Sequence, residues 1–286
     1  IGTITSEVAE RTGLSKETMV FAGAADNACG ALGAGVLSEG KTMCSIGTSG
    51  VVLSFEKDST LDFGGKVHYF NHAIQDAYYS MGVTLSAGHS LDWFKQNFST
   101  KDEGFEELLD GIDQIGPGSN GLLFTPYIIG ERTPYSDADI RGSFIGIDSS
   151  HTKKEFVRAV LEGITFSLNE TIEIFKQQEK DVRSIISIGG GAKNKVWLQM
   201  QADIFNIPIE TLANEQGPGV GAAMIAAIGL GWYSTVEEYA EHFVKVGNRY
   251  EPINANVGAY AELYQIYRQI YTQTKQLNQR LKRFRR

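Results

Sequence analysis

The sequence predicts an α/β fold in which helices cover a central β-sheet. Short apolar segments alternate along the chain with longer segments whose apolar residues recur at helical spacing, as is typical of such folds. Hydrophobic residues make up 42% of the chain and charged residues 21%, so a packed core is available. The 286 residues contain neither an internal repeat nor a linker rich in Pro and Ser. One large domain over residues 1–286 is therefore the simplest organisation.

The N-terminal part of the chain is expected to hold mostly strands. Apolar, β-rich runs bounded by turn residues predict these strands at residues 18–22, 41–45, 51–55 and 77–84. The first is expected to be buried, and a segment of small residues at 25–35 follows it. The spacing of Leu91, Phe94 and Phe98 then predicts a helix over 86–98.

The rest of the chain continues the alternation with longer helices. Strands are predicted at residues 122–127, 184–188 and 207–212, and a polar loop at 130–142. Helices are predicted at residues 154–178, 194–205, 217–231 and 255–286. The last carries Tyr260, Tyr264, Tyr267 and Tyr271 at three-to-four spacing, an apolar stripe that we expect to pack on its own domain. A homodimer remains the alternative that the sequence leaves open.

Charge and cysteine content narrow the function classes. The chain has 26 basic and 34 acidic residues, a net charge of −8, so a general nucleic-acid binder is not expected. No apolar run approaches the 18 or more residues of a membrane span, so no membrane partner is expected. An anionic small ligand stays compatible, because backbone N–H groups at helix starts bind phosphate whatever the net charge. Cys29 and Cys44 cannot build a disulfide scaffold and are expected as buried residues in a reducing, cytoplasmic compartment.

Two well-known templates do not fit the chain. Residues 35–42 match the G-x4-G-K-T expression, but that phosphate loop requires a strand before it and a helix after it. Here a small-residue helix precedes the match and a strand follows, so we expect a surface turn. His68 and His72 lie four residues apart in a predicted strand or loop, which does not place them on one face, and no metal site is expected.

Asp26 is the first candidate for chemistry. It lies between Ala25 and Asn27 in a run of Gly, Ala and Cys, residues too small to block a ligand. A carboxylate that accepts a proton from a bound hydroxyl needs such room, whereas a helix cap does not. The residues alone leave both roles open.

Three glycine clusters are candidate ligand contacts. Gly47, Thr48 and Ser49 follow a predicted strand, where either a hairpin turn or a phosphate clamp fits. Residues 189–194 follow a strand and open a helix, the context in which a helix N-terminus binds a ligand, and three successive glycines are costly in chain entropy. Residues 217–223 have alternate glycines without dinucleotide-binding spacing, which favours a close-packed helix start.

These segments together resemble the FGGY family of carbohydrate kinases, most closely its xylulose-phosphorylating members. The likeness lies in the run around Asp26, the Gly47–Gly50 turn, the Gly-Glu-Arg-Thr-Pro loop at 130–134, residues 142–162 and the glycines at 189–191 followed by Trp197. Order and spacing match over nearly the whole chain.

The resemblance implies an actin-like ATPase, or ribonuclease-H-like, fold with a mixed sheet covered by helices. Family members have two such domains with a cleft between them, and this chain is similar to the second, so it is expected to be the C-terminal, nucleotide-binding half, with the N-terminal sugar-binding domain as its partner. The implied activity is ATP- and Mg²⁺-dependent phosphorylation of D-xylulose to D-xylulose 5-phosphate. Alternatives are another FGGY kinase, acting on glycerol, gluconate or another sugar or polyol, and an actin-like nucleotide-binding module without sugar kinase activity.

Site residues follow from the same resemblance. Asp26 would be the general base for the sugar hydroxyl, and Asn27 would contact the sugar. The other implied residues hold the nucleotide: Gly47, Thr48 and Ser49 at the β- and γ-phosphates, Gly88 nearby, and Gly190, Gly191 and Asn194 at the adenosine. At Asp92 glycerol kinases have Gln, so no nucleotide role is carried to it.

Overall fold

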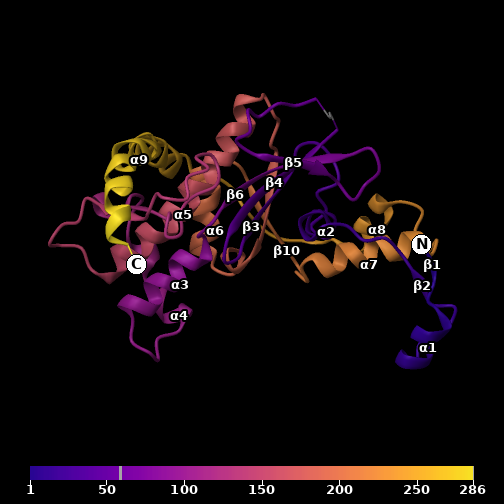
Figure 1. Ribbon diagram of the computed structural model, residues 1–286. Helices are drawn as coiled ribbons and strands as arrows, with labels where there is room; N and C mark the ends of the chain where they lie inside the picture. Colours follow the sequence, from indigo (N-terminus) through magenta and orange to yellow (C-terminus); the bar gives the residue numbers. More distant parts are fainter. Residues whose placement is uncertain (58–59, 286) are drawn as a thin grey trace.

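The computed structural model describes residues 1–57 and 60–285, and over these residues the chain is built around a seven-stranded mixed sheet (Figure 1). The strand order is β11-β10-β9-β3-β4-β6-β5. The strands are β3 (Lys41–Ile46), β4 (Gly50–Glu56), β5 (His68–Asn71), β6 (Tyr78–Thr84), β9 (Ser184–Gly189), β10 (Ile209–Leu212) and β11 (Val246–Tyr250). Only β3, β9 and β10 are parallel to one another, and the remaining pairs in the sheet are antiparallel. The predicted α/β fold with a mixed sheet is confirmed.

The register of the central strands brings two glycine turns together. In the β3–β4 hairpin Ile46 pairs with Gly50, so residues 47–49 form the turn. On its other side β3 runs parallel to β9, and Ile46 pairs with Gly189. Both glycine clusters therefore leave the sheet at the same edge, one strand apart, although more than 130 positions separate them in the sequence.

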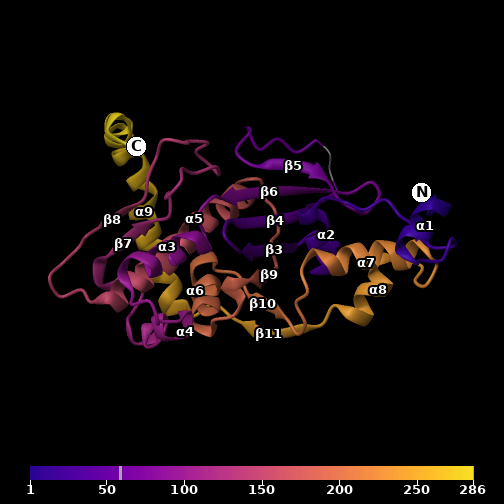
Figure 2. The same ribbon diagram turned by 60° about the horizontal axis from the view of Figure 1, so that its bottom comes forward.

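Helices cover both faces of the sheet (Figure 2). Along β3, Cys44 and Ile46 belong to one core cluster and Met43 to another, as the alternation of side chains across a strand requires. The first face packs against α5 (Lys153–Gln177) and α6 (Lys195–Phe205). On these helices pack α3 (Gly88–Phe98) and α9 (Asn254–Leu281), which belong to the same core cluster. The second packs against α2 (Asp26–Gly33), behind which lie α7 (Pro218–Gly229) and α8 (Val236–Phe243).

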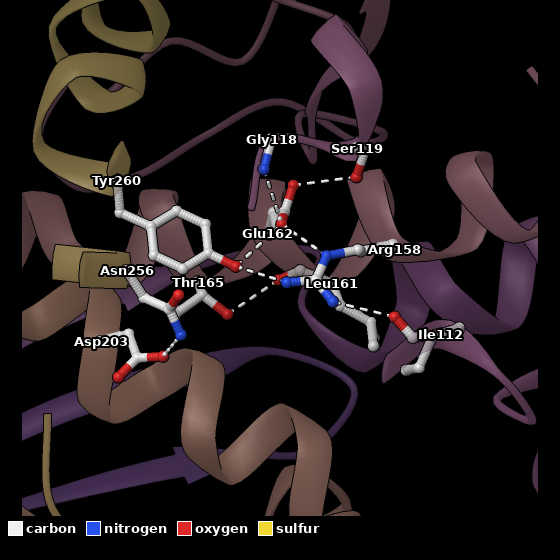
Figure 3. A network of polar contacts seen from close by, with 10 residues as sticks. All are labelled: Ile112, Gly118, Ser119, Arg158, Leu161, Glu162, Thr165, Asp203, Asn256 and Tyr260. Carbon is white, nitrogen blue, oxygen red and sulfur yellow. Dashed lines mark hydrogen bonds and ion pairs between the residues drawn. The ribbon is translucent and has the colours of Figure 1, made fainter. Parts of the chain in front are cut away.

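A buried ion pair on α5 is hydrogen-bonded to α9, the other long helix of the described chain (Figure 3). Arg158 Nε donates to Glu162 Oε1 at 2.9 Å along α5, and the Tyr260 hydroxyl of α9 donates to the same oxygen at 2.8 Å. Glu162 also accepts the backbone N–H of Gly118 and the hydroxyl of Ser119 from the segment between α4 and β7. The four tyrosines predicted as a stripe on α9 are buried within the chain, so the expected packing on its own domain is confirmed.

The first strand prediction is wrong. Residues 18–22 contain only the two-residue β2 (Met19–Val20), which pairs with β1 (Gly2–Thr3) in a separate sheet, and Met19 is 43% exposed. With α1 (Ser6–Thr12), these elements lie at the end of the molecule beyond α7 and α8 (Figure 2). The run is apolar, but Met19 and Val20 are exposed and Phe21 lies against Gly229 of α7, so the run does not form a strand of the central sheet.

Several small elements were not predicted from the sequence. They are α1, α4 (Phe105–Leu108), β5, α8, β11 and β8 (Ser143–Ile145), which pairs with β7 (Leu123–Thr125). The loop at 130–142 is present as expected. The terminal helix ends at Leu281, a short 3₁₀ turn follows at Lys282–Phe284, and Arg286 lies outside the described residues. Within the described residues no helix is both long and apolar enough to cross a membrane.

Close helix packing explains Gly221, one of the three glycines at 217–223, where the sequence predicted a close-packed helix start. Helices α2 and α7 cross so closely that a Cβ on Gly221 would lie 1.9 Å from the carbonyl oxygen of Cys29. That oxygen belongs to the backbone and cannot rotate away. A substitution at this position must therefore push the two helices apart.

We accordingly expect Gly221→Ala to lower the free energy of unfolding by about 1–3 kcal/mol, the usual cost of overpacking. Gly219→Ala is the matched control, because it lies on the same helix with no atom within 4 Å of the added Cβ. In a helix Ala is favoured over Gly by about 1 kcal/mol, so this change should be neutral or stabilising. Urea denaturation measures both variants, and equal midpoints for Gly221→Ala and Gly219→Ala would contradict the packing argument.

Candidate functional site

A cavity of about 600 Å³ opens where β3 and β9 end. Its walls come from Ile46, the turn after β3, the start of α3, the short helix α4, the 3₁₀ turn η3 (Gly190–Ala192) and the first turn of α6. This volume is within the range of small-molecule sites. The cavity therefore gathers segments from the N-terminal third and the middle of the chain at one edge of the sheet.

The turn at 47–49 is fixed by the start of α3. Gly88 N–H donates to the carbonyl of Gly47 at 2.8 Å, and His89 N–H donates to the carbonyl of Thr48 at 3.0 Å. The first N–H groups of a helix have no partner inside the helix, and here the turn supplies it. A Cβ at position 88 would lie 2.4 Å from the Gly47 oxygen, so this contact requires glycine at Gly88.

The second glycine cluster packs just as tightly against β3. A Cβ on Gly191 would lie 2.7 Å from the Ile46 side chain, so only glycine lets this turn lie on the strand end. Gly190 differs, because its Cβ would meet nothing closer than 3.5 Å. Asn194 then caps α6, with its side-chain oxygen accepting the Trp197 N–H at 3.0 Å.

Part of the cavity lining is apolar. Its apolar side chains are Leu91, Phe105, Leu109 and Trp197, of which Leu91 and Trp197 are buried. The Trp197 indole N–H donates to the Thr165 hydroxyl on α5 at 3.0 Å, which fixes the ring. Polar groups, including Asp92, lie around the same cavity. Apolar side chains beside glycine turns suit a ligand with a planar ring and an anionic tail.

Six of the nine residues that the sequence singled out meet in this cavity. They are Gly47, Thr48, Gly88, Gly190, Gly191 and Asn194. Ser49 is in the same turn but does not line the cavity, and Asp26 and Asn27 lie outside it. The structure therefore brings the expected nucleotide residues together and keeps the expected base separate from them.

Asp26 is an exposed carboxylate in the first turn of α2. The N-cap of this helix is Ala25, so Asp26 is its first helical residue and does not occupy the N-cap position. Its Oδ1 accepts the backbone N–H of Asn27 at 2.7 Å and the side-chain amide of Asn27 at 3.2 Å. The helix dipole favours a negative charge at this position. The carboxylate is thus open to solvent and to an acceptor molecule.

Some cavity residues were missed by the sequence reasoning. His89, Leu91 and Asp92 line the cavity together with Gly88, and this spacing marks one face of a helix, a signal that was available. Asp92, to which no nucleotide role was assigned, is among them. Phe105 and Glu106 come from α4, which has only four residues and is too short to show a helical period.

Two buried carboxyls lie outside the cavity, Glu131 in the 130–142 loop and Glu170 on α5. Burial raises the pKa of Glu131 to about 7, partly offset by N–H groups of Arg132 and Leu85 that donate to it. Burial also raises the pKa of Glu170 to about 8. Glu170 Oε1 accepts the hydroxyl of Tyr135, while within the described residues its Oε2 has no hydrogen-bond partner.

Replacing Glu170 is expected to change how stability depends on pH. Between pH 4.5 and about 8 the unfolded chain releases this proton and the folded chain keeps it. The free energy of unfolding therefore falls as pH rises through this window, by up to about 1.4 kcal/mol per pH unit. Glu170→Gln should remove that decline. Urea denaturation of the wild type and Glu170→Gln from pH 5 to 8 measures this dependence. The difference between their free energies of unfolding cancels the contribution of the other titrating groups. A difference that stays constant over this pH range would contradict the prediction.

Comparison with known proteins identifies the family. Residues 42–230 match the model of the FGGY family of carbohydrate kinases, C-terminal domain. The chain is 57% identical over 285 residues to the xylulose kinase of Bacillus subtilis, of which it covers 57%. It superposes on ligand-bound xylulose kinase from Lactobacillus acidophilus with a TM-score of 0.90 at 28% identity, covering 96% of this chain and 56% of that one.

A gluconate kinase from the same Lactobacillus is similar as well, with a TM-score of 0.88 and 28% identity over 94% of this chain and 55% of the other. The chain thus spans about half the length of the relatives that it matches. The family match covers both cavity-forming glycine turns, β3 and the parallel strands beside it. This chain belongs to the FGGY family of carbohydrate kinases.

Proposed function

We propose that this chain is the nucleotide-binding half of an ATP-dependent kinase that phosphorylates D-xylulose to D-xylulose 5-phosphate. The observation that carries the proposal is the convergence of Gly47, Thr48, Gly88, Gly190, Gly191 and Asn194 on one cavity. The sugar is proposed from the 57% identical relative, which is named a xylulose kinase. Because this chain covers 57% of that relative, an N-terminal domain is its proposed partner and supplies much of the sugar site.

In this proposal the two glycine turns hold ATP. The turn of Gly47, Thr48 and Ser49 lies at the β- and γ-phosphates, since glycine allows close approach of the backbone. Thr48 and Ser49 supply the N–H groups, because the Gly47 N–H already donates to the Ser49 carbonyl at 3.0 Å. Gly190, Gly191 and Asn194 hold the adenosine, with Trp197 as a flat neighbour. Phosphoryl transfer depends mainly on positioning and charge stabilisation, which is what such an arrangement provides.

Asp26 acts as the general base for the acceptor. Its carboxylate takes the proton of the sugar's terminal hydroxyl as that oxygen forms a bond to the γ-phosphorus, and the bond from phosphorus to the oxygen of ADP breaks. Asn27, which hydrogen-bonds to this carboxylate, contacts the sugar. The separation of Asp26 from the nucleotide cavity fits a reaction in which acceptor and nucleotide occupy different places.

The residues present also fit the Mg²⁺ that such kinases use. Among residues 1–57 and 60–285 no group of three or more His, Cys, Asp or Glu side chains is placed to hold a metal ion. Mg²⁺ in kinases is bound chiefly by substrate phosphates and water, which needs no such cage. When bound, it neutralises phosphate charge. Closure of an N-terminal domain over the site would exclude water, so this half alone should bind nucleotide weakly and transfer phosphate slowly.

The test is a coupled ADP-release assay on the chain joined to its N-terminal domain, with D-xylulose, glycerol and gluconate as separate acceptors. Turnover with D-xylulose alone supports the proposal. Turnover with gluconate, the second candidate because the gluconate kinase superposes almost as well, would keep the mechanism and change the sugar. Nucleotide binding without turnover on any acceptor would favour a nucleotide-binding module without sugar chemistry.

A further inference from the structure

The Gly-Glu-Arg-Thr-Pro loop is anchored to the end of β6 by a buried carboxylate. Thr133 N–H donates to the carbonyl of Val83 at 3.0 Å, and the Thr133 hydroxyl accepts the N–H of Val83 at 3.0 Å. Inside the loop, Glu131 and Asp137 exchange backbone hydrogen bonds of 2.8 and 2.9 Å. Although residues 130–142 were expected only as a polar loop, Glu131 is 1% exposed.

Both oxygens of the Glu131 carboxylate accept hydrogen bonds from backbone N–H groups or a hydroxyl near the end of β6. Its Oε1 accepts the N–H of Leu85 at 3.0 Å and that of Arg132 at 2.7 Å. Its Oε2 accepts the hydroxyl of Ser167 on α5 at 3.1 Å, and Ser167 Oγ lies 2.9 Å from Thr84 Oγ1. A buried carboxyl is costly unless it is hydrogen-bonded, and here the donors come from the connection after β6, from the loop itself and from α5.

The Glu131 contacts are connected through the start of α3 to the 47–49 turn that lines the cavity. Leu85 begins the three-residue connection from β6 to α3, and Gly88 and His89 follow it. Their N–H groups hold the carbonyls of Gly47 and Thr48. The position of Leu85 therefore sets where α3 begins, and the start of α3 sets the position of the 47–49 turn.

We propose that Glu131 is a positioning residue for the 47–49 turn, acting through Leu85 and the first residues of α3. It touches neither the cavity nor its contents, so it is not a catalytic residue. Its effect on nucleotide binding rests on the proposed function, whereas its effect on the order of residues 85–89 does not.

Amide hydrogen exchange and MgADP affinity, measured on the same variants, test this inference. In Glu131→Ala we expect exchange at residues 85–89 to rise about tenfold or more, because the buried N–H of Leu85 loses its acceptor. The Kd for MgADP should rise by about the same factor. Glu131→Gln keeps one acceptor oxygen and should fall between the wild type and Glu131→Ala in both measurements.

Glu162→Gln is the matched control. Glu162 is also 1% exposed and also accepts a backbone N–H and a serine hydroxyl, from Gly118 and Ser119, but it lies outside the cavity. A merely destabilising change of this kind should leave exchange at 85–89 and the Kd unaltered at temperatures where the variant is folded. If Glu162→Gln does not fold, the comparison of Glu131→Gln with Glu131→Ala still tests the inference.

The outcomes separate this inference from the proposed function. Unchanged exchange at residues 85–89 in folded Glu131→Ala overturns the positioning role. Increased exchange with an unchanged MgADP Kd overturns its link to the nucleotide. If the wild type itself does not bind MgADP, the proposed function fails, and the exchange measurement still decides whether Glu131 holds the turn.

Discussion

Asp26→Asn is expected to lower kcat for D-xylulose phosphorylation by about 10²–10⁴-fold in the chain joined to its N-terminal domain. Asparagine has the shape of aspartate but cannot accept the proton of the sugar hydroxyl. MgADP affinity should stay nearly unchanged, because Asp26 does not line the cavity that we assign to the nucleotide. Steady-state kinetics and calorimetric titration of ADP measure the two quantities separately.

The control must separate chemistry from helix stability, since Asp26 also lies favourably at a helix start. Glu237 is an exposed acid in the first turn of α8, so Glu237→Gln removes a comparable helix-dipole interaction. It should cost a similar few tenths of a kcal/mol in stability and leave kcat unchanged. Asp26→Asn with kcat within a factor of about three of the wild type would show that Asp26 is not the base.

Arg158→Met is expected to lower the free energy of unfolding by about 3–5 kcal/mol, because it leaves Glu162 as a buried charge without its partner. The two side chains are 7% and 1% exposed, and Arg158 also donates to the Ile112 carbonyl and the Tyr260 hydroxyl (Figure 3). The loss therefore loosens the contact of α5 with α9 and with the segment before β7.

An exposed pair on the same helix provides the comparison for Arg158→Met. Glu173 and Lys176 form an ion pair with side chains 34% and 40% exposed, so Glu173→Gln should cost less than about 1 kcal/mol. Replacing both buried partners, as Arg158→Met with Glu162→Leu, should recover part of the loss, since no lone charge remains. Equal denaturation midpoints for Arg158→Met and Glu173→Gln would contradict this account.

The central hairpin and its turn could be predicted because each depends on local pattern. Met43, Cys44 and Ile46 lie in an apolar run bounded by glycine, and the hairpin follows from it. The glycine turn after β9 likewise lies between a strand and a helix in the sequence. Both turns meet at one edge because β3 and β9 are parallel neighbours, a pairing that was not predicted. The family resemblance implied only that both turns contact one nucleotide.

The predictions from sequence were wrong or incomplete where they depended on which residues are buried. Met19 and Val20 have the composition of a core strand, but they pair only with Gly2 and Thr3 in the described chain and stay exposed. Glu131 lies in a polar segment typical of a surface loop, yet donors from that loop and from two other segments, the connection after β6 and α5, make its burial tolerable. Neither outcome follows from the spacing of residues near those positions, because each depends on what packs against them.

Titration of MgADP into the isotope-labelled protein, followed by amide chemical shifts, tests most directly whether this edge of the sheet is a nucleotide site. The account predicts binding, weak in this half alone, with shift changes concentrated at residues 47–49, 88–89 and 190–194 and small changes at Asp26. Absence of any shift change at millimolar MgADP, or changes confined to a different part of the chain, would contradict it.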